Sequence, residues 1–145
     1  MKNGLRSYQA PWALVAVFYL FLIAWTFVAV PPVIARATRS EPGDILQLIM
    51  IIGIFSFTWY FSLGVYYRIR QEADGTIELS GVRKTHKVHP RDITIVEGPF
   101  FPIGFVRFKS GREKLYLLCS VKHPDLQAIL KRVGEMNLNI RFKTR

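Results

Sequence analysis

Two long stretches of the chain lack every charged residue and histidine. Residues 12–30 and 45–67 contain no Asp, Glu, Lys, Arg or His. An α-helix needs about 20 apolar residues, each rising ~1.5 Å, to cross a ~30 Å hydrocarbon layer. The sequence therefore predicts a hairpin of two transmembrane helices. The absence of ionisable groups within the spans argues against a transporter or channel built from this chain alone.

Cysteine is nearly absent, and so are the residue patterns of metal sites and catalytic centres. The single Cys119 lies in an apolar, strand-like run and cannot form an intramolecular disulfide. His86 and His89 are three residues apart, so in a strand they point to opposite faces and make a poor metal chelate. The chain has no nucleophile elbow, phosphate-binding glycine loop or close carboxylate pair. We expect no catalytic residue, cofactor or metal, and predict that the protein is not an enzyme.

Positive charge is concentrated after the second apolar stretch. Residues 68–145 hold 16 of the 20 Lys and Arg and 8 of the 10 Asp and Glu, which accounts for +8 of the formal net charge of +10. Basic residues near span ends favour the cytoplasmic side of a membrane. We therefore expect both termini in the cytoplasm and the short connector between the spans outside.

A signal peptide is the alternative explanation of the first apolar stretch. Lys2 and Arg6 precede it, and Ala35-Arg36-Ala37 has the outline of a cleavage site. The apolar run is longer than the ~7–15 residues of a signal-peptide core, and Pro31-Pro32 is typical of a boundary between helix and loop. A transmembrane helix is the favoured interpretation.

The second apolar stretch carries a line of small and polar residues spaced three or four apart, which places them on one helical face: Gly53, Ser56, Tyr60 and Gly64. Small residues let two helix backbones approach closely inside a membrane. We expect this line to be a helix-packing surface. We favour the first span as the partner of this surface, and another membrane protein is the alternative.

The remainder of the chain has the pattern of a small α+β domain. Glycine turns at Asp74-Gly75 and Ser110-Gly111 separate six β-like runs, over residues 66–70, 76–80, 83–88, 93–96, 105–109 and 114–120. Apolar residues then recur at the spacing of an amphipathic helix, at Leu126, Ile129, Leu130 and Val133. An antiparallel sheet closed by a C-terminal helix would bury both apolar faces. We place the N-terminal segment and hairpin in residues 1–67 and the domain in residues 68–145.

The order of these elements resembles the pleckstrin-homology-like (PH-like) domains of small bacterial membrane proteins. The resemblance covers residues 66–136 and rests on Arg68-Ile69, the Asp74-Gly75 turn, the break at Gly81 and the segment 89–93. It implies an antiparallel β-sandwich or barrel capped by a helix, a binding or scaffolding role, and a bacterial inner membrane. Six strands are expected where the family has seven. The cations are not in the first hairpin turn, so phosphoinositide binding does not carry over.

Two segments of this domain are candidate surfaces for lipid or a partner. The densest basic segment contains Arg83, Lys84, Lys87 and Arg91, which either meet anionic headgroups or form an ordinary solvated strand face. A loop bracketed by prolines carries Phe100 and Phe101, and Arg107 and Lys109 follow it. The two rings either form a tip that contacts a membrane or partner, or plug the open end of the sandwich.

The sequence thus favours a non-catalytic, membrane-anchored interaction or assembly module for other integral membrane proteins. Two alternatives are an anionic-lipid surface sensor that uses the basic domain and a permanent accessory subunit of a larger inner-membrane complex. Nucleic acid is not the expected partner, because alternating aromatic and basic residues occur in any half-buried strand and a lipid surface accounts for the charge. Formation of a homo-oligomer is a further alternative.

Overall fold

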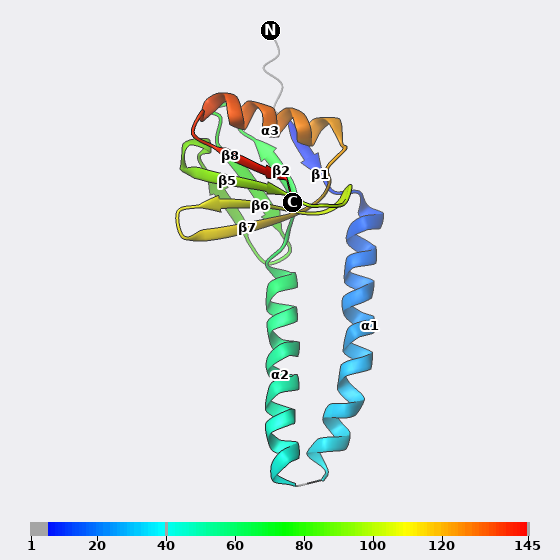
Figure 1. Cartoon of the computed structure of the whole chain (residues 1–145). Coiled ribbons are helices and arrows are strands. Elements are labelled where there is room, and N and C mark those ends of the chain that lie inside the picture. Colours follow the sequence, from blue (N-terminus) through cyan, green and yellow to red (C-terminus); the bar gives the residue numbers. More distant parts are fainter. Residues whose placement is uncertain (1–5, 40, 145) are drawn as a thin grey trace. The chain divides into compact units, whose positions relative to one another are not determined.

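The computed structural model describes residues 6–39 and 41–144 of the chain (Figure 1). The chain divides into two compact units. One is a helical hairpin, Trp12–Leu63, and the other is a sheet domain formed by the residues before Trp12 and those from Gly64 onward. We describe each unit by itself.

The hairpin consists of α1 (Trp12–Ala37) and α2 (Pro42–Leu63). Both helices are long and apolar enough to cross a membrane, with mean hydropathy of 2.5 and 1.8 over an 18-residue stretch of each. Only 6% of that stretch is buried in either helix. At ~1.5 Å per residue, α1 is about 39 Å long. The prediction of two span-length apolar helices is confirmed.

The helix ends differ from those expected. Pro31 and Pro32 lie inside α1 and do not end it. Each proline removes one backbone hydrogen bond, but helix-forming residues follow, and Arg36 places a cation in the last turn, where the helix dipole favours it. The second helix ends at Leu63, four residues before the expected boundary, because Tyr66 pairs with β-strand neighbours instead.

Contacts between α1 and α2 involve a polar pair as well as apolar side chains. The indole Nε1 of Trp59 donates a hydrogen bond of 3.1 Å to Oγ1 of Thr26, which itself donates to the carbonyl of Leu22. Both Leu22 and Ala29 of α1 are buried. A hydrogen bond between apolar helices is favourable because no water competes for either group. The side of α2 that carries Trp59 is therefore the side that packs on α1.

In the part of the chain that the structure describes, the sheet domain contains eight strands, a short 3₁₀ helix over Pro90–Asp92 and the helix α3 (Pro124–Met136). The strands are β1 (Ser7–Gln9), β2 (Tyr66–Gln71), β3 (Ile77–Gly81), β4 (Thr85–Val88), β5 (Ile93–Gly98), β6 (Ile103–Ser110), β7 (Glu113–Ser120) and β8 (Arg141–Thr144). Their order in the sheet is β4-β3-β2-β7-β6-β5-β8, and β1 pairs with β2. All six expected strands are present, and two more join them.

The expectation of a purely antiparallel sheet is wrong. The strand β2 pairs in parallel with β7 through Tyr66 and Leu117, and β5 pairs in parallel with β8. A parallel pair needs a long crossover connection. The chain connects β2 to β7 through β3, β4, β5 and β6, and it connects β5 to β8 through β6, β7 and α3 (Figure 1). The result is a mixed sheet with a C-terminal helix, which agrees with the predicted α+β class.

The strand β1 comes from the segment before the hairpin and corrects the predicted domain boundary. Its residue Tyr8 lies opposite Ile69 of β2, and Ala10 N donates a 2.7 Å hydrogen bond to the carbonyl of Tyr67. Residues 6–11 and 64–67, which the sequence assigned to the hairpin segment, therefore belong to the sheet domain. Sequence patterning missed β1 because three residues are too short to show an alternation.

The domain core is formed by the inward faces of the strands and by one side of α3. Leu126, Ile129 and Val133 are fully buried, which confirms the predicted stripe, while Leu130 is half-buried. The Asp74-Gly75 and Ser110-Gly111 turns also form as predicted, with Gly75 and Gly111 at φ of 88° and 58°, where glycine has no steric penalty. The ring of Tyr8 joins this core at 1% exposure, and its hydroxyl accepts a 2.9 Å hydrogen bond from Ser120 N.

We predict that Tyr8→Ala lowers the free energy of unfolding of the sheet domain by about 3–5 kcal/mol, the usual cost of removing a buried aromatic ring. The variant Tyr8→Phe keeps the ring and loses only the bond from Ser120, so it should cost about 1 kcal/mol. A urea titration of the full-length protein in detergent, with alkylation of the buried Cys119 as the readout of unfolding, measures both. Equal losses in the two variants would show that the ring does not support the core.

Candidate functional site

The line of small and polar residues on α2 does not pack against α1. Gly53, Ser56 and Tyr60 are exposed, and a Cβ added at Gly53 would meet no atom within 4 Å. Gly64 lies beyond the end of α2 and belongs to the sheet domain. The favoured expectation, that this line forms the seam of the hairpin, is wrong because Trp59 and its neighbours occupy that seam. We call Gly53 and Ser56 the open face of α2.

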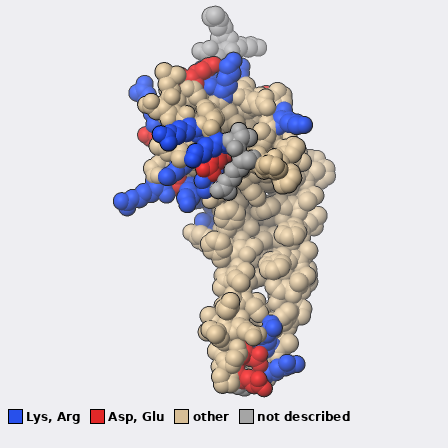
Figure 2. All heavy atoms as spheres, viewed as in Figure 1, with Lys and Arg blue, Asp and Glu red and all other residues tan. Residues whose placement is uncertain are grey.

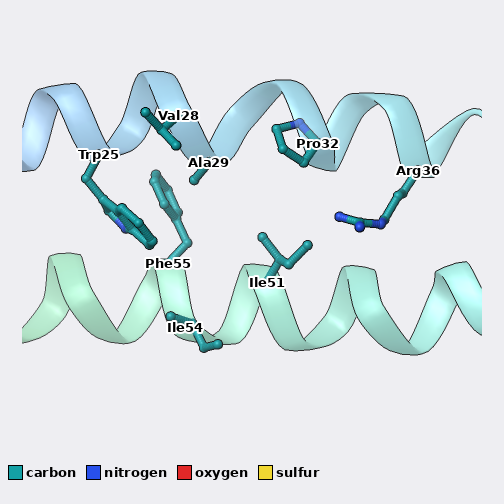
Figure 3. Close-up of a pocket in the computed structure, with 8 residues that line it drawn as sticks. All are labelled: Trp25, Val28, Ala29, Pro32, Arg36, Ile51, Ile54 and Phe55. Carbon is teal, nitrogen blue, oxygen red and sulfur yellow. The ribbon is translucent and has the colours of Figure 1, made fainter.

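A cleft of about 290 Å³ lies between the two helices of the hairpin (Figure 3). Apolar side chains form most of its lining, which consists of Trp25, Val28, Ala29, Pro32, Arg36, Ile51, Ile54 and Phe55. The guanidinium of Arg36 extends into the space between the helices at one end of the cleft (Figure 3). Because this lining contains no acid, histidine or nucleophile, the cleft suits an apolar group and offers no acid–base chemistry.

The four cations of the basic segment do not form one site. Arg83 and Lys84 lie in the turn between β3 and β4, and the Lys84 ammonium is 5.9 Å from the centre of the Tyr66 ring. Lys87 is at the other end of β4, and Arg91 follows in the 3₁₀ helix. With ~3.3 Å per strand residue, the two ends of β4 are about 10 Å apart. The predicted basic cluster is therefore divided between two ends of a strand pair.

Acidic side chains pair with two of the cations that the sequence singled out, Lys87 and Arg107. Lys87 donates to Glu72 at 2.5 Å and lies 3.6 Å from Glu78, and the bond to Glu72 raises the pKa of Lys87. Arg107 pairs with Glu97, which raises its pKa in the same way. On the visible face, Figure 2 shows Lys and Arg dispersed over the sheet domain, with acids among them. Much of the charge of the domain is thus spread out, and three cations, Arg6, Lys131 and Arg132, line a pocket of about 270 Å³ together with Ala128 and Glu135.

Histidines of the domain also have structural partners. His86 Nε2 lies 3.2 Å from the carboxylate of Glu113, and the His123 ring packs edge-on against Tyr8 at 5.0 Å. The side chain of His89 accepts a hydrogen bond from the backbone of Arg91. Within residues 6–39 and 41–144, no group of three His, Cys, Asp or Glu side chains is placed to hold a metal ion.

The aromatic loop presents two adjacent exposed phenylalanines on the sheet domain. We define it as residues 99–102, between β5 and β6. Phe100 and Phe101 are 77% and 69% exposed, and their rings meet edge-on at 5.3 Å. Ile103, which begins β6, is 55% exposed. Because both phenylalanines are open to solvent, the expectation that they plug the end of the sheet is wrong. The alternative of an exposed tip agrees with this geometry. Lys109 lies six residues beyond Ile103 on the same strand.

No family model, curated protein or solved structure matches this chain. Function is therefore inferred from three features: the pairing of β1 with β2, the open face of α2 and the aromatic loop.

Cys119 of β7 has 0% exposure, and burial raises the pKa of its thiol to about 11. We predict that iodoacetamide at pH 8 alkylates it at least ~100-fold more slowly in the folded than in the urea-unfolded protein, because the thiolate is the reactive form. The folded state holds the proton more tightly, so this group's contribution to stability is present below about pH 9 and is lost as the pH rises toward 11. Equal alkylation rates would contradict a buried thiol.

Proposed function

We propose that α1 and α2 cross a bacterial inner membrane as a hairpin and that the protein is a non-catalytic interaction or assembly module for other integral membrane proteins. The sheet domain is a PH-like module on the cytoplasmic side in this proposal. The open face of α2 is the surface that contacts the partner. The exposure of Gly53 and Ser56 on this face is the observation on which the proposal rests.

The pairing of β1 with β2 supports the membrane assignment. These strands lie on either side of the hairpin in the sequence, and they can pair only if the chain before α1 and the chain after α2 are on the same side of the membrane. Two crossings satisfy this condition. Cleavage of a signal peptide near residues 35–37 would remove β1 from the sheet, which argues against that alternative. The excess of basic residues in the domain favours the cytoplasm.

The open face of α2 supports an interaction with another membrane helix. Side chains are small at Gly53 and Ser56, and close approach of backbones at small residues is a main source of helix association in membranes. The hairpin leaves these residues exposed because its own seam is on the side of Trp59. Apolar residues elsewhere on α2 are well solvated by lipid. The small residues are therefore the part of the helix whose packing energy increases most on contact with a protein partner.

Element order supports the PH-like module. Two antiparallel groups, β2-β3-β4 and β5-β6-β7, precede the helix α3, in the order that the resemblance implies. Recognition of anionic headgroups by the basic segment has less support, because Arg83 and Lys84 lie apart from Lys87 and Arg91, and Lys87 is paired with acids.

The first experiment is extraction of the tagged full-length protein in mild detergent, followed by a native gel and mass spectrometry of whatever migrates with it. A stoichiometric membrane protein in the same band is the expected result. Retention of that protein throughout growth would indicate a permanent subunit, and transient association would indicate an assembly factor. Migration as a bare monomer or homodimer would overturn the proposal.

We predict that Gly53→Leu removes most of the partner from the native complex, because a leucine at this position prevents close helix approach. The hairpin itself should be unaffected, since a Cβ at Gly53 meets nothing. The matched control is Gly43→Leu in the first turn of α2, where an added Cβ also meets nothing and which lies about 80° around the helix from Gly53. Loss of the partner in both variants, or in neither, would contradict a contact at the open face.

A further inference from the structure

The aromatic loop has a fixed shape within the sheet domain. Pro99 folds back against Gly104, where an added Cβ would lie 2.8 Å from the proline ring. The carbonyl of Pro102 accepts a 2.8 Å hydrogen bond from Val121 N, which ties the loop to the end of β7. A preformed loop loses little conformational entropy when its exposed side chains are buried by a partner. Burial of Phe100 and Phe101 by a partner would therefore have a small cost in conformational entropy.

The same loop lies next to the place where the chain leaves the sheet domain for α1. Ser120 pairs with Ile103 at the base of the loop and donates to the hydroxyl of Tyr8, three residues before Pro11. Ala10 in turn is bonded to Tyr67, so the residues that lead into α1 and out of α2 are adjacent within the domain. The loop between β5 and β6 and the strand β1 lie on one side of the domain (Figure 1).

We propose that the aromatic loop inserts Phe100 and Phe101 into the interfacial layer of the same bilayer that α1 and α2 cross, as a third attachment of the domain to the membrane. The inference rests on the membrane assignment made under the proposed function. A residue that directly precedes a membrane span lies at the bilayer surface, and the loop is tied to such residues through Tyr8. Aromatic side chains are well suited to this layer.

The bilayer fits this loop better than a protein partner does. The tip offers two rings and no polar side chain that would orient a specific ligand. Residues 68–145 of the domain behind it carry a net charge of +8, which attracts the anionic cytoplasmic leaflet. Together, apolar insertion and positive charge are the two components of interfacial binding.

Accessibility of a nitroxide at position 101 tests the inference. The variant Phe101→Cys, labelled and reconstituted alone as the full-length protein in vesicles of phosphatidylcholine and phosphatidylglycerol, is exposed to oxygen and to a water-soluble nickel chelate. Native Cys119 is buried and should stay unlabelled. We expect the label at position 101 to collide with oxygen and to be protected from nickel, and this protection to be lost in the added presence of Phe100→Ser.

The control label is at Leu138, an apolar residue of the domain with 90% exposure. It adjoins Asn137, which is bonded to Ile93 at the start of β5, whereas the aromatic loop follows the end of that strand about 16 Å away. This label should be accessible to nickel. Nickel accessibility at position 101 equal to that at position 138 would overturn the inference, as would a label at 101 shielded from both reagents, which would indicate a protein contact.

A third label separates failure of this inference from failure of the membrane assignment. Phe57 is exposed on α2, six residues before its end at Leu63, so Phe57→Cys should carry a label that lies within the hydrocarbon layer and is protected from nickel. If position 57 is protected and position 101 is not, only the loop insertion is wrong. Accessibility of both positions to nickel would overturn the membrane assignment as well.

Discussion

The short pairing between β1 and β2 is the contact on which the rest of the structure depends. It joins residues that the whole hairpin separates in the sequence, and it does so with only three residues of β1. The central residue of that strand, Tyr8, contributes its ring to the core and a hydrogen-bond acceptor to Ser120 at the end of β7. One short segment thus connects the start of α1, the end of α2 and the base of the aromatic loop.

Charge and apolar surface are distributed differently. Cations of the sheet domain are distributed over several elements: Lys87 and Arg107 face acidic side chains, and Arg6, Lys131 and Arg132 line a pocket with Glu135. In the same domain Phe100, Phe101 and Ile103 are exposed next to one another at the aromatic loop, whereas Val82, Leu138 and Phe142 are exposed elsewhere. For the aromatic loop, a local apolar tip on a basic domain favours a surface as partner over a small ligand.

Local patterns predicted the elements well, and contacts between distant segments were not predictable in the same way. Period-2 runs, the Asp74-Gly75 turn and the stripe that begins at Leu126 are local signals, and all appear in the fold. Neither β1 nor β8 carries such a signal, because each depends on a partner strand found elsewhere in the chain. The spacing of Gly53 and Ser56 predicted a shared face correctly, but only the position of Trp59 shows that this face turns away from α1. Exposure of Phe100 and Phe101 likewise depends on how the sheet closes.

The pairing of β1 with β2 also has a consequence for the order of events during synthesis. The ribosome makes β1 first. It reaches Tyr66, the first residue of β2, 57 residues after Gln9, when the entire hairpin has been made. At ~5–20 residues per second, β1 waits about 3–11 s for its partner. During that interval Tyr8 has no core to enter. Folding of the domain is therefore delayed until both helices exist, and a closed domain marks a nascent chain whose hairpin has been completed.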